Sequence, residues 1–332
     1  MRILTAVFVL TFAWVAASSA APPFPDLVPG YTQELYAVYP DGLLSIAFAP
    51  DGDVLSIVDH GFAGGSVALV RFDAQSTTVT HGQIVHPPVG TLPSPNASVG
   101  GIVSHPDGSL YLSSFYGPVH IDGTTGAVLA GPVSSSHAFQ IAVDPTNSSR
   151  LVGANYGGLV EIDAVTLAGT PYPIWNPSQV ALVDVAIDAS GSPYVGAYDQ
   201  FAGFPGPNAY RIELLNPISQ ALGVSATLPD VPHQIALFDG LSNIIAQLSD
   251  GRLMRADLSS EAPGTIAATP FATSDFPGRG VRIGPEGCLY VVQRGTRFED
   301  GDVTNESSIV RVCPEAVRTE ATTWGKLKAA YR

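Results

Sequence analysis

Asp184 and His233 are the two residues of this sequence best suited by type to acid–base chemistry. Asp184 stands directly before the short apolar run Val185-Ala186-Ile187, and His233 stands one residue farther from the similar run Ile235-Ala236-Leu237, with Gln234 between them. A carboxylate close to an imidazole can tune that ring as a general base. Because the two runs are alike, we expect both residues at the same end of equivalent elements, where they form the candidate catalytic pair.

Further polar residues at similar places extend this candidate site. They stand just before such an apolar run or at the end of the run that follows it. The candidate ligand contacts are Ser114, Gln140, Asn155, Gln234, Gln247, Arg279 and Gln293, with His60 on a Gly-rich segment as a further one. The alternative interpretation is a water-filled centre in which these side chains satisfy exposed backbone groups.

Signatures of metal or covalent chemistry are weak. Asp184 is the one good ligand for a hard cation in this set, and therefore the candidate metal ligand. The seven histidines lack HxxxH and HExxH spacing, and the acidic segment 299–306 lacks the spacing of an EF-hand. GxSxG and Walker signatures are absent as well. We expect no obligatory cofactor, with Ca²⁺ or another divalent cation as the alternative.

A repeated phrase identifies the elements that must position these residues. An apolar, a variable, an apolar and an acidic residue recur at intervals of 41 to 56 residues, close to the period of propeller blades. The copies are Val70–Asp73, Val119–Asp122, Val160–Asp163, Tyr210–Glu213, Met254–Asp257 and, ending before Cys313, Val310–Val312. Upstream of each copy, two apolar runs flank a turn, often Asp-Gly or Pro-Asp, that is typical of hairpins. The sequence predicts an all-β fold, a six-bladed β-propeller of four-stranded blades over residues 21–316. Segments 77–85 and 265–271 are expected as fourth strands.

The last blade lacks a fourth strand of its own. Tyr31–Tyr39 is a spare β-prone segment near the N-terminus, and we expect it to close the ring in that blade, where it protects an open edge. Cys288 and Cys313 then start one strand and end the next, so antiparallel pairing sets them opposite each other. Opposed residues lie within disulfide range. We expect a structural cross-strand disulfide.

The phrase Ile46–Gly52, with Leu110-Tyr111-Leu112 and Leu289-Tyr290-Val291, resembles NHL-repeat and SMP-30/gluconolactonase-like propellers. In the SMP-30 branch the resemblance implies a divalent metal in the central channel, held by Glu, Asn and Asp from different blades. The residues just before the six innermost runs are Ser45, Gly101, Gln140, Asp184, Gln234 and Gly280. Of the expected ligands, only the Asp is matched. Quinone-dependent sugar dehydrogenases share a six-bladed propeller, but their catalytic His and basic residues are not matched here.

The two ends of the chain differ from the repeat region. Residues 1–20 have a basic start, an apolar run and small residues before a cleavage point, which predicts a signal peptide and a secreted protein, periplasmic in a Gram-negative host. Residues 317–332 form a basic tail, interpreted as a docked helix, a disordered end or a sorting signal. Three Asn-x-Ser sites are candidates for glycosylation in a eukaryotic host: Asn96, Asn147 and Asn305.

Charge and loop lengths define the expected function. The formal net charge of −14 opposes binding to nucleic acid or anionic lipid, and we expect a monomer without stable membrane insertion. Four long segments that connect strands at one end of the blades predict a binding face: His60–Ser66, Ile84–Gly100, Asp199–Asn208 and Arg294–Ser307. The leading hypothesis is a binding or scaffold module for a protein, glycan or small molecule. The alternative is a lactonase-like hydrolase of SMP-30 type with a metal in the channel.

Overall fold

A computed structural model describes most of the chain between residues 24 and 315. The described residues are 24–40, 42–59, 67–74, 80–81, 83–84, 99–114, 116–133, 138–155, 158–172, 180–199, 210–216, 221–238, 243–257, 266–274, 278–299 and 302–315. All of their secondary-structure elements are strands, and none of their elements is a helix long and apolar enough to cross a membrane. The predicted all-β class is confirmed. The expected signal peptide and basic tail lie outside these residues.

The described residues form six separate sheets, each with its neighbouring strands in hydrogen-bonded order. The first sheet, taken from the innermost strand outward, contains β2 (Gly42–Phe48), β3 (Val54–Asp59), β4 (Val67–Phe72) and β6 (Gln83–Ile84). The second contains β7 (Val99–Ser104), β8 (Leu110–Ser114), β9 (Val119–Ile121) and β10 (Val128–Ala130). The third contains β11 (Gln140–Val143), β12 (Arg150–Asn155), β13 (Gly158–Asp163) and β14 (Gly169–Pro171).

The other three sheets follow the same antiparallel order, and two of them gain a fifth strand. The fourth sheet contains β15 (Val180–Ile187), β16 (Pro193–Asp199), β17 (Tyr210–Asn216), β18 (Ala221–Leu228) and β22 (Ile266–Ala267). The fifth contains β19 (Pro232–Phe238), β20 (Asn243–Leu248), β21 (Leu253–Asp257) and β23 (Thr269–Ala272). The sixth contains β24 (Gly278–Ile283), β25 (Leu289–Glu299), β26 (Asp302–Pro314), β1 (Tyr31–Tyr39) and β5 (Thr80–His81).

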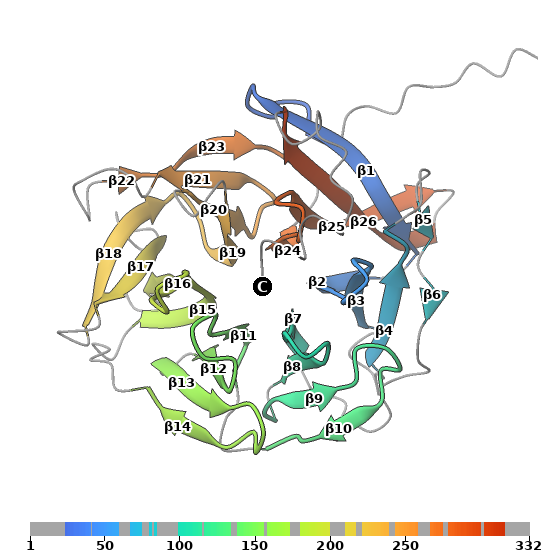
Figure 1. Cartoon of the computed structure of the whole chain (residues 1–332). Coiled ribbons are helices and arrows are strands. Elements are labelled where there is room, and N and C mark those ends of the chain that lie inside the picture. The colour runs from blue at the N-terminus through green and yellow to red at the C-terminus, as the bar shows by residue number, and fades with distance from the viewer. Residues whose placement is uncertain are drawn as a thin grey trace, which may run out of the picture.

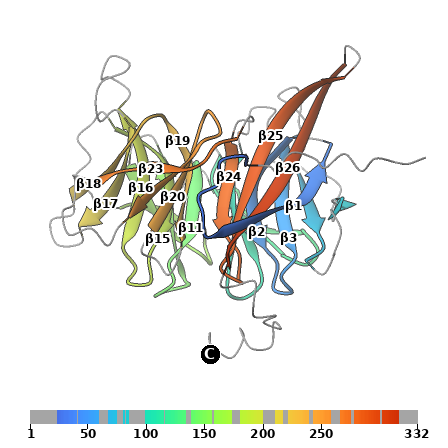
Figure 2. The same cartoon turned by 90° about the horizontal axis from the view of Figure 1, so that it is seen from above.

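The sheets stand around a common centre in the arrangement of a β-propeller (Figure 1). The innermost strands are β2, β7, β11, β15, β19 and β24, and each contacts the next, with β24 also against β2. Seen from the side, the strands run between the two faces of the ring (Figure 2). This arrangement brings one equivalent residue from each innermost strand to the ring centre.

Apolar side chains fill the spaces between neighbouring sheets. Ile57 and Leu69 of the first sheet cluster with Ile102, Leu110 and Leu112 of the second, and all five are at most 2% exposed. A sheet that packs on both faces buries residues of both alternating sets. The same pattern around the ring fixes how the innermost strands lie against one another.

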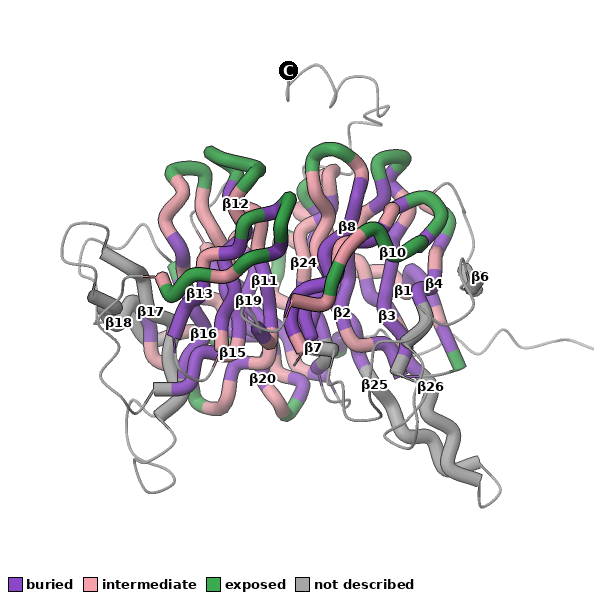
Figure 3. Tube along the Cα trace, turned by 90° about the horizontal axis from the view of Figure 1, so that it is seen from below, coloured by how far each residue is buried: buried purple, intermediate pink, exposed green. Residues whose placement is uncertain are grey.

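Tight turns link the innermost strand of a sheet to the second. In two of them, Gly52 (φ 96°) and Gly108 (φ 91°) adopt the left-handed conformation that glycine tolerates best. Their N–H groups donate to the carbonyl oxygens of Ala49 and His105. Exposed turns gather on one face of the ring (Figure 3). The predicted turns at Asp51-Gly52 and Asp107-Gly108 are confirmed, whereas the one predicted at Asp239-Gly240 lies outside the described residues.

The N-terminal strand β1 pairs antiparallel with β26, from Tyr31 opposite Pro314 to Tyr39 opposite Ser307. Arg311 of β26 contacts the Glu34 carboxylate on β1, and its guanidinium lies 5.7 Å from the centre of the Tyr36 ring. Cys288 and Cys313 form the predicted disulfide, with Cα atoms 4.4 Å apart. The last sheet is therefore joined to the N-terminal strand by ladder bonds and an ion pair, and is itself crosslinked by the disulfide.

Two expectations about strand limits are wrong. Each segment predicted as a single fourth strand is divided between two sheets, because β5 pairs parallel with β1, and β22 pairs parallel with β18. These short strands cover outer edges that would otherwise stay unpaired. The segment Arg294–Ser307, predicted as a loop, instead continues the pairing of β25 with β26 as far as Glu299 opposite Asp302.

Candidate functional site

Six equivalent residues of the innermost strands meet at the ring centre, and we name them the ring-centre positions. Their side chains, where present, are buried rather than open to solvent: Gln140 is 6% exposed, and Ser45, Asp184 and Gln234 are not exposed at all. The positions are Ser45, Gly101, Gln140, Asp184, Gln234 and Gly280. The sequence pattern thus placed these residues at equivalent positions, and the structure shows that the side chains present there are buried.

Two of these side chains bind the backbone of the next innermost strand. The N–H of Ile235 on β19 donates to Oδ2 of Asp184 on β15 at 2.6 Å. The N–H of Val281 on β24 donates to Oε1 of Gln234 on β19 at 2.8 Å. Buried backbone donors require a partner. These side chains supply it from the neighbouring sheet, so they tie adjacent sheets together.

Ser45 and Gln140, on the other side of the ring, each bind the backbone of a neighbouring innermost strand, β7. The N–H of Ile102 on β7 donates to Oγ of Ser45 at 3.3 Å, and Nε2 of Gln140 donates to the carbonyl of Gly100 at 2.6 Å. A Cβ added at Gly101 would lie 1.8 Å from Oε1 of Gln140. Glycine at this ring-centre position is what leaves room for the glutamine.

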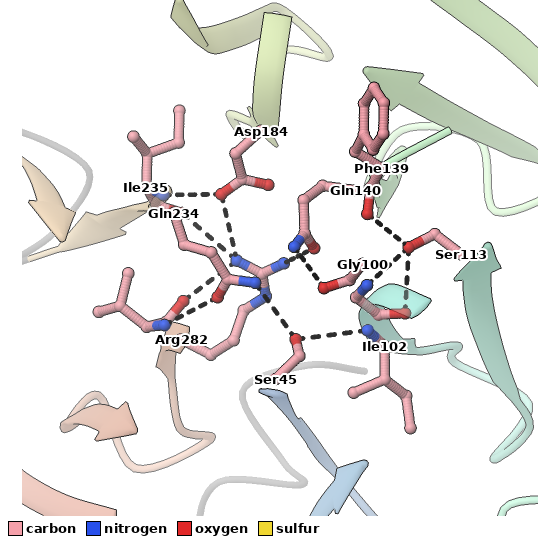
Figure 4. A network of polar contacts seen from close by, with 12 residues as sticks. Ser45, Gly100, Ile102, Ser113, Phe139, Gln140, Asp184, Gln234, Ile235 and Arg282 are labelled. Atoms are coloured by element: carbon pink, nitrogen blue, oxygen red, sulfur yellow. Dashed lines mark hydrogen bonds and ion pairs between the residues drawn. The ribbon is translucent and has the colours of Figure 1, made fainter. Parts of the chain in front are cut away.

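A single arginine reaches across the ring centre from β24 (Figure 4). Nη1 of Arg282 donates to the carbonyl oxygens of Val281 at 3.1 Å and Ile235 at 3.4 Å, and lies 3.5 Å from Oδ2 of Asp184. Nη2 donates to Oε1 of Gln140, on the opposite side of the ring, at 3.4 Å. The guanidinium therefore links four of the innermost strands.

Arg282 is the functional residue that the sequence reasoning missed, although a signal for it was present. It is the second residue of the apolar run on its strand. The five equivalent residues are Ala47, Val103, Ala142, Ala186 and Ala236. These five residues pack in the apolar clusters between neighbouring sheets, so a charged residue at the sixth equivalent position stands out in the sequence.

The electrostatics of the site depend on one ion pair, between the buried Asp184 and the partly buried Arg282. Burial raises the pKa of Asp184, while Arg282 and the N–H groups of Ile235 and Val185 oppose the rise. Oδ1 of Asp184 is buried, and no described residue donates a hydrogen bond to it. An ionised carboxylate is costly to bury without a counter-charge. The guanidinium supplies that charge.

The residues at the ring centre do not fit the divalent metal that the SMP-30 resemblance implies. A hard cation needs several carboxylate or carbonyl oxygens directed at it. Here the oxygens of Asp184 and Gln140 already face a guanidinium, and the described parts of the chain contain no group of three or more His, Cys, Asp or Glu placed to hold a metal. A resident cation already occupies the position where a metal would be bound.

Three other predicted contacts are buried and bonded to nearby protein groups. Ser114 donates to the carbonyl of Gly117, and Nε2 of Gln247 donates to that of Val292 at 2.9 Å. Nε2 of Gln293 donates to a serine hydroxyl at 2.6 Å. Contacts of this kind are what the alternative interpretation expects, because there the polar side chains form hydrogen bonds to other groups of the protein rather than to a ligand. Oε1 of Gln247 is buried without a hydrogen-bond partner among the described residues.

The remaining predicted residues are half-buried or lie outside the described part of the chain. His233 lies half-buried on β19, beside Gln234, and Asn155 lies half-buried at the end of β12. The pairing of Asp184 with His233 stays a prediction. Arg279 belongs to β24, but its side chain lies outside the described residues, as does the whole of His60.

Comparison with known proteins supports the fold and no closer relationship. No protein-family model matches the sequence, and no curated protein matches it. Among solved structures, the chain is similar to a PQQ-bound aldose sugar dehydrogenase from Streptomyces coelicolor, with a TM-score of 0.57 and 16% identity over 87% of this chain and 100% of that one. It is also similar to a Trichoderma reesei carbohydrate-active enzyme of family AA12, with a TM-score of 0.61 and 12% identity over 89% and 99% of the two chains. Identities this low show a shared propeller fold alone.

Proposed function

We propose that this protein is a secreted binding propeller that engages its ligand through the face bearing its long loops, without a metal in the ring centre. The single observation that carries the proposal is the guanidinium of Arg282, which fills the ring centre against Asp184 and Gln140. With that position occupied, the recognition surface has to lie elsewhere. The ligand classes we consider are a protein, a glycan and a small molecule.

The order of the strands favours one face of the ring over the other as the binding face. Segments 60–66 and 200–209 connect the second strand of a sheet to the third, and segment 85–98 connects an outermost strand to the next innermost one. In an antiparallel blade these connections emerge at one end of the strands, opposite the tight turns. Long connections on a rigid scaffold commonly carry binding residues.

The finer assignments belong to the same proposal. We propose that the six sheets are the six blades of a closed ring, with β1 completing the last blade, and that the chain is a distant NHL-repeat or SMP-30-like propeller. Secretion is supported by the disulfide, which persists in oxidising compartments, together with the apolar leader of the sequence. Asn147, exposed in the third sheet's turn, is a candidate for glycosylation.

An enzyme is the alternative function, and the similar solved structures suggest which substrates to test. Two are named for sugars, an aldose sugar dehydrogenase and a carbohydrate-active enzyme, so saccharides are the first ligands to try. PQQ is a tricarboxylate, and the described residues do not offer it a free basic side chain at the ring centre, because Arg282 is already engaged by Asp184. A lactonase-like hydrolase would need the metal site that Arg282 fills.

The test combines metal analysis, turnover and binding on the secreted, full-length protein. We expect no stoichiometric metal by elemental analysis, no hydrolysis of lactones and no oxidation of aldoses with added PQQ. We also expect saturable binding to a component of an immobilised saccharide or extracellular-protein array. Replacing segment 200–209 with a short Gly-Ser linker should weaken that binding at least tenfold, whereas Ser190→Ala, on the turn-bearing face, should not. Metal-dependent lactone turnover would refute the proposal.

A further inference from the structure

The oxygens that face Arg282 are of the types that bind hard cations. They comprise one carboxylate oxygen of Asp184, the amide oxygen of Gln140, and the backbone carbonyls of Ile235 and Val281, all within 3.5 Å of a guanidinium nitrogen. Carboxylate, amide and backbone oxygens are the usual ligands of Ca²⁺. The ring centre is therefore an oxygen cage around a positive charge.

The cage is held together by bonds that do not involve Arg282. Oδ2 of Asp184 accepts from the Ile235 N–H at 2.6 Å, and Nε2 of Gln140 donates to the Gly100 carbonyl at 2.6 Å. The other two oxygens belong to the backbones of β19 and β24. Removing the guanidinium would thus leave the oxygens in place, as a preorganised site.

The cage also needs a cation. Asp184 is completely buried, its Oδ1 has no hydrogen-bond donor among the described residues, and Arg282 is the cation paired with it. Removing one partner of a buried ion pair leaves an uncompensated charge, which is strongly destabilising. A second cation that fits the cage would recover that loss.

We infer that the ring centre is a cation site whose permanent occupant is the side chain of Arg282, and that truncating this side chain converts the cage into a binding site for Ca²⁺ or free guanidinium. The protein is thus independent of metal because it carries its own cation. This inference concerns the ring centre and does not rest on the proposed ligand at the loop-bearing face.

The repeat indicates that the truncated side chain is compatible with the fold. Arg282→Ala places at this position the residue that the chain already has at Ala47, Ala142, Ala186 and Ala236. Arg282→Met is a second variant that keeps most of the side-chain volume without the charge. Asp184→Asn combined with Arg282→Ala is the matched control, because it keeps an oxygen for the Ile235 N–H but removes the charge that attracts a cation.

The experiment measures thermal midpoints and calcium titrations for the full-length secreted proteins. The wild type should have the same midpoint in EDTA, in Ca²⁺ and in low guanidinium chloride. Arg282→Ala should melt lower in EDTA and recover by about 4 °C when Ca²⁺ is at a hundredfold excess over its dissociation constant. Calorimetry should give one Ca²⁺ per chain, and the double variant should not respond.

Several results would overturn the inference. One is stoichiometric metal in the wild type, lost together with stability in EDTA. Another is a folded Arg282→Ala protein that responds to neither Ca²⁺ nor guanidinium. A third is the failure of both Arg282→Ala and Arg282→Met to fold even when produced with Ca²⁺ present. A response in the double variant equal to that in Arg282→Ala would also contradict it, because Asp184 would then not be the ligand.

Discussion

Replacing both cysteines of the Cys288–Cys313 disulfide with alanine should destabilise the protein by a calculable amount. The bridge closes a loop with a sequence separation of 25. In the chain-entropy description, the loss is about 2.1 cal/mol/K plus about 1.5R ln n, which gives roughly 3.5 kcal/mol at 25 °C for this loop. Alanine is preferable to serine because Cys288 is only 2% exposed, and a buried hydroxyl would add its own cost.

The assay for this prediction is thermal unfolding of the oxidised wild type, the reduced wild type and the double alanine variant. Unfolding entropy of about 2.1 cal/mol/K per residue amounts to roughly 0.7 kcal/mol/K for a chain of this size, so the midpoint should fall by about 5 °C. The reduced wild type should match the variant. An unchanged midpoint, or free thiols found in the untreated wild type, would refute the reasoning.

Two further predictions follow from the structure. The first tests the close contact between two neighbouring sheets, and the second tests a turn on the face that bears the tight turns. A Cβ at Gly100 would lie 1.5 Å from the backbone oxygen of Phe139, so Gly100→Ala should cost about 3 kcal/mol or more in denaturant titrations, and a loss below about 1 kcal/mol would contradict this close approach. Burial raises the pKa of Asp107, but hydrogen bonds from Ser109 and His105 outweigh it and lower the pKa to about 2. A depressed carboxyl pKa stabilises the fold above the unfolded value of about 3.9 and ceases to do so as pH falls toward 2. The stability deficit of Asp107→Asn, measured by denaturant titration, should therefore be largest near neutral pH and shrink on acidification; a deficit independent of pH would contradict it.

The strands were predictable because their signals are local and repeated. The turn at Asp51-Gly52 needs a glycine with positive φ, and the same requirement recurs at Gly108 and Gly287. The pairing of Cys288 with Cys313 followed from counting residues back from one hairpin. Pairings between distant segments, such as β5 with β1, have no such signal, because two-residue strands carry too little pattern to show a partner.

The candidate site was only half predictable. Gln140, Asp184 and Gln234 were correctly grouped by their place in the repeat, but their position near an apparent mouth suggested ligand contacts, whereas they are buried. The reason is the obligation to satisfy backbone donors such as the N–H groups of Ile235 and Val281. Which donor needs a side-chain partner depends on how two sheets meet, and a single repeat does not contain that information.

The repeat itself explains why one arginine suffices at the ring centre. Six equivalent arginines would place six like charges around one axis, whereas one guanidinium, paired with the one carboxylate among the ring-centre positions, leaves the centre neutral. The ring can therefore accept a charged residue at this place in a single blade if a partner charge lies in another blade. Arg282 and Asp184, on β24 and β15, meet that condition. A change at either position alone should alter the ring centre more than a change at any of the alanines equivalent to Arg282.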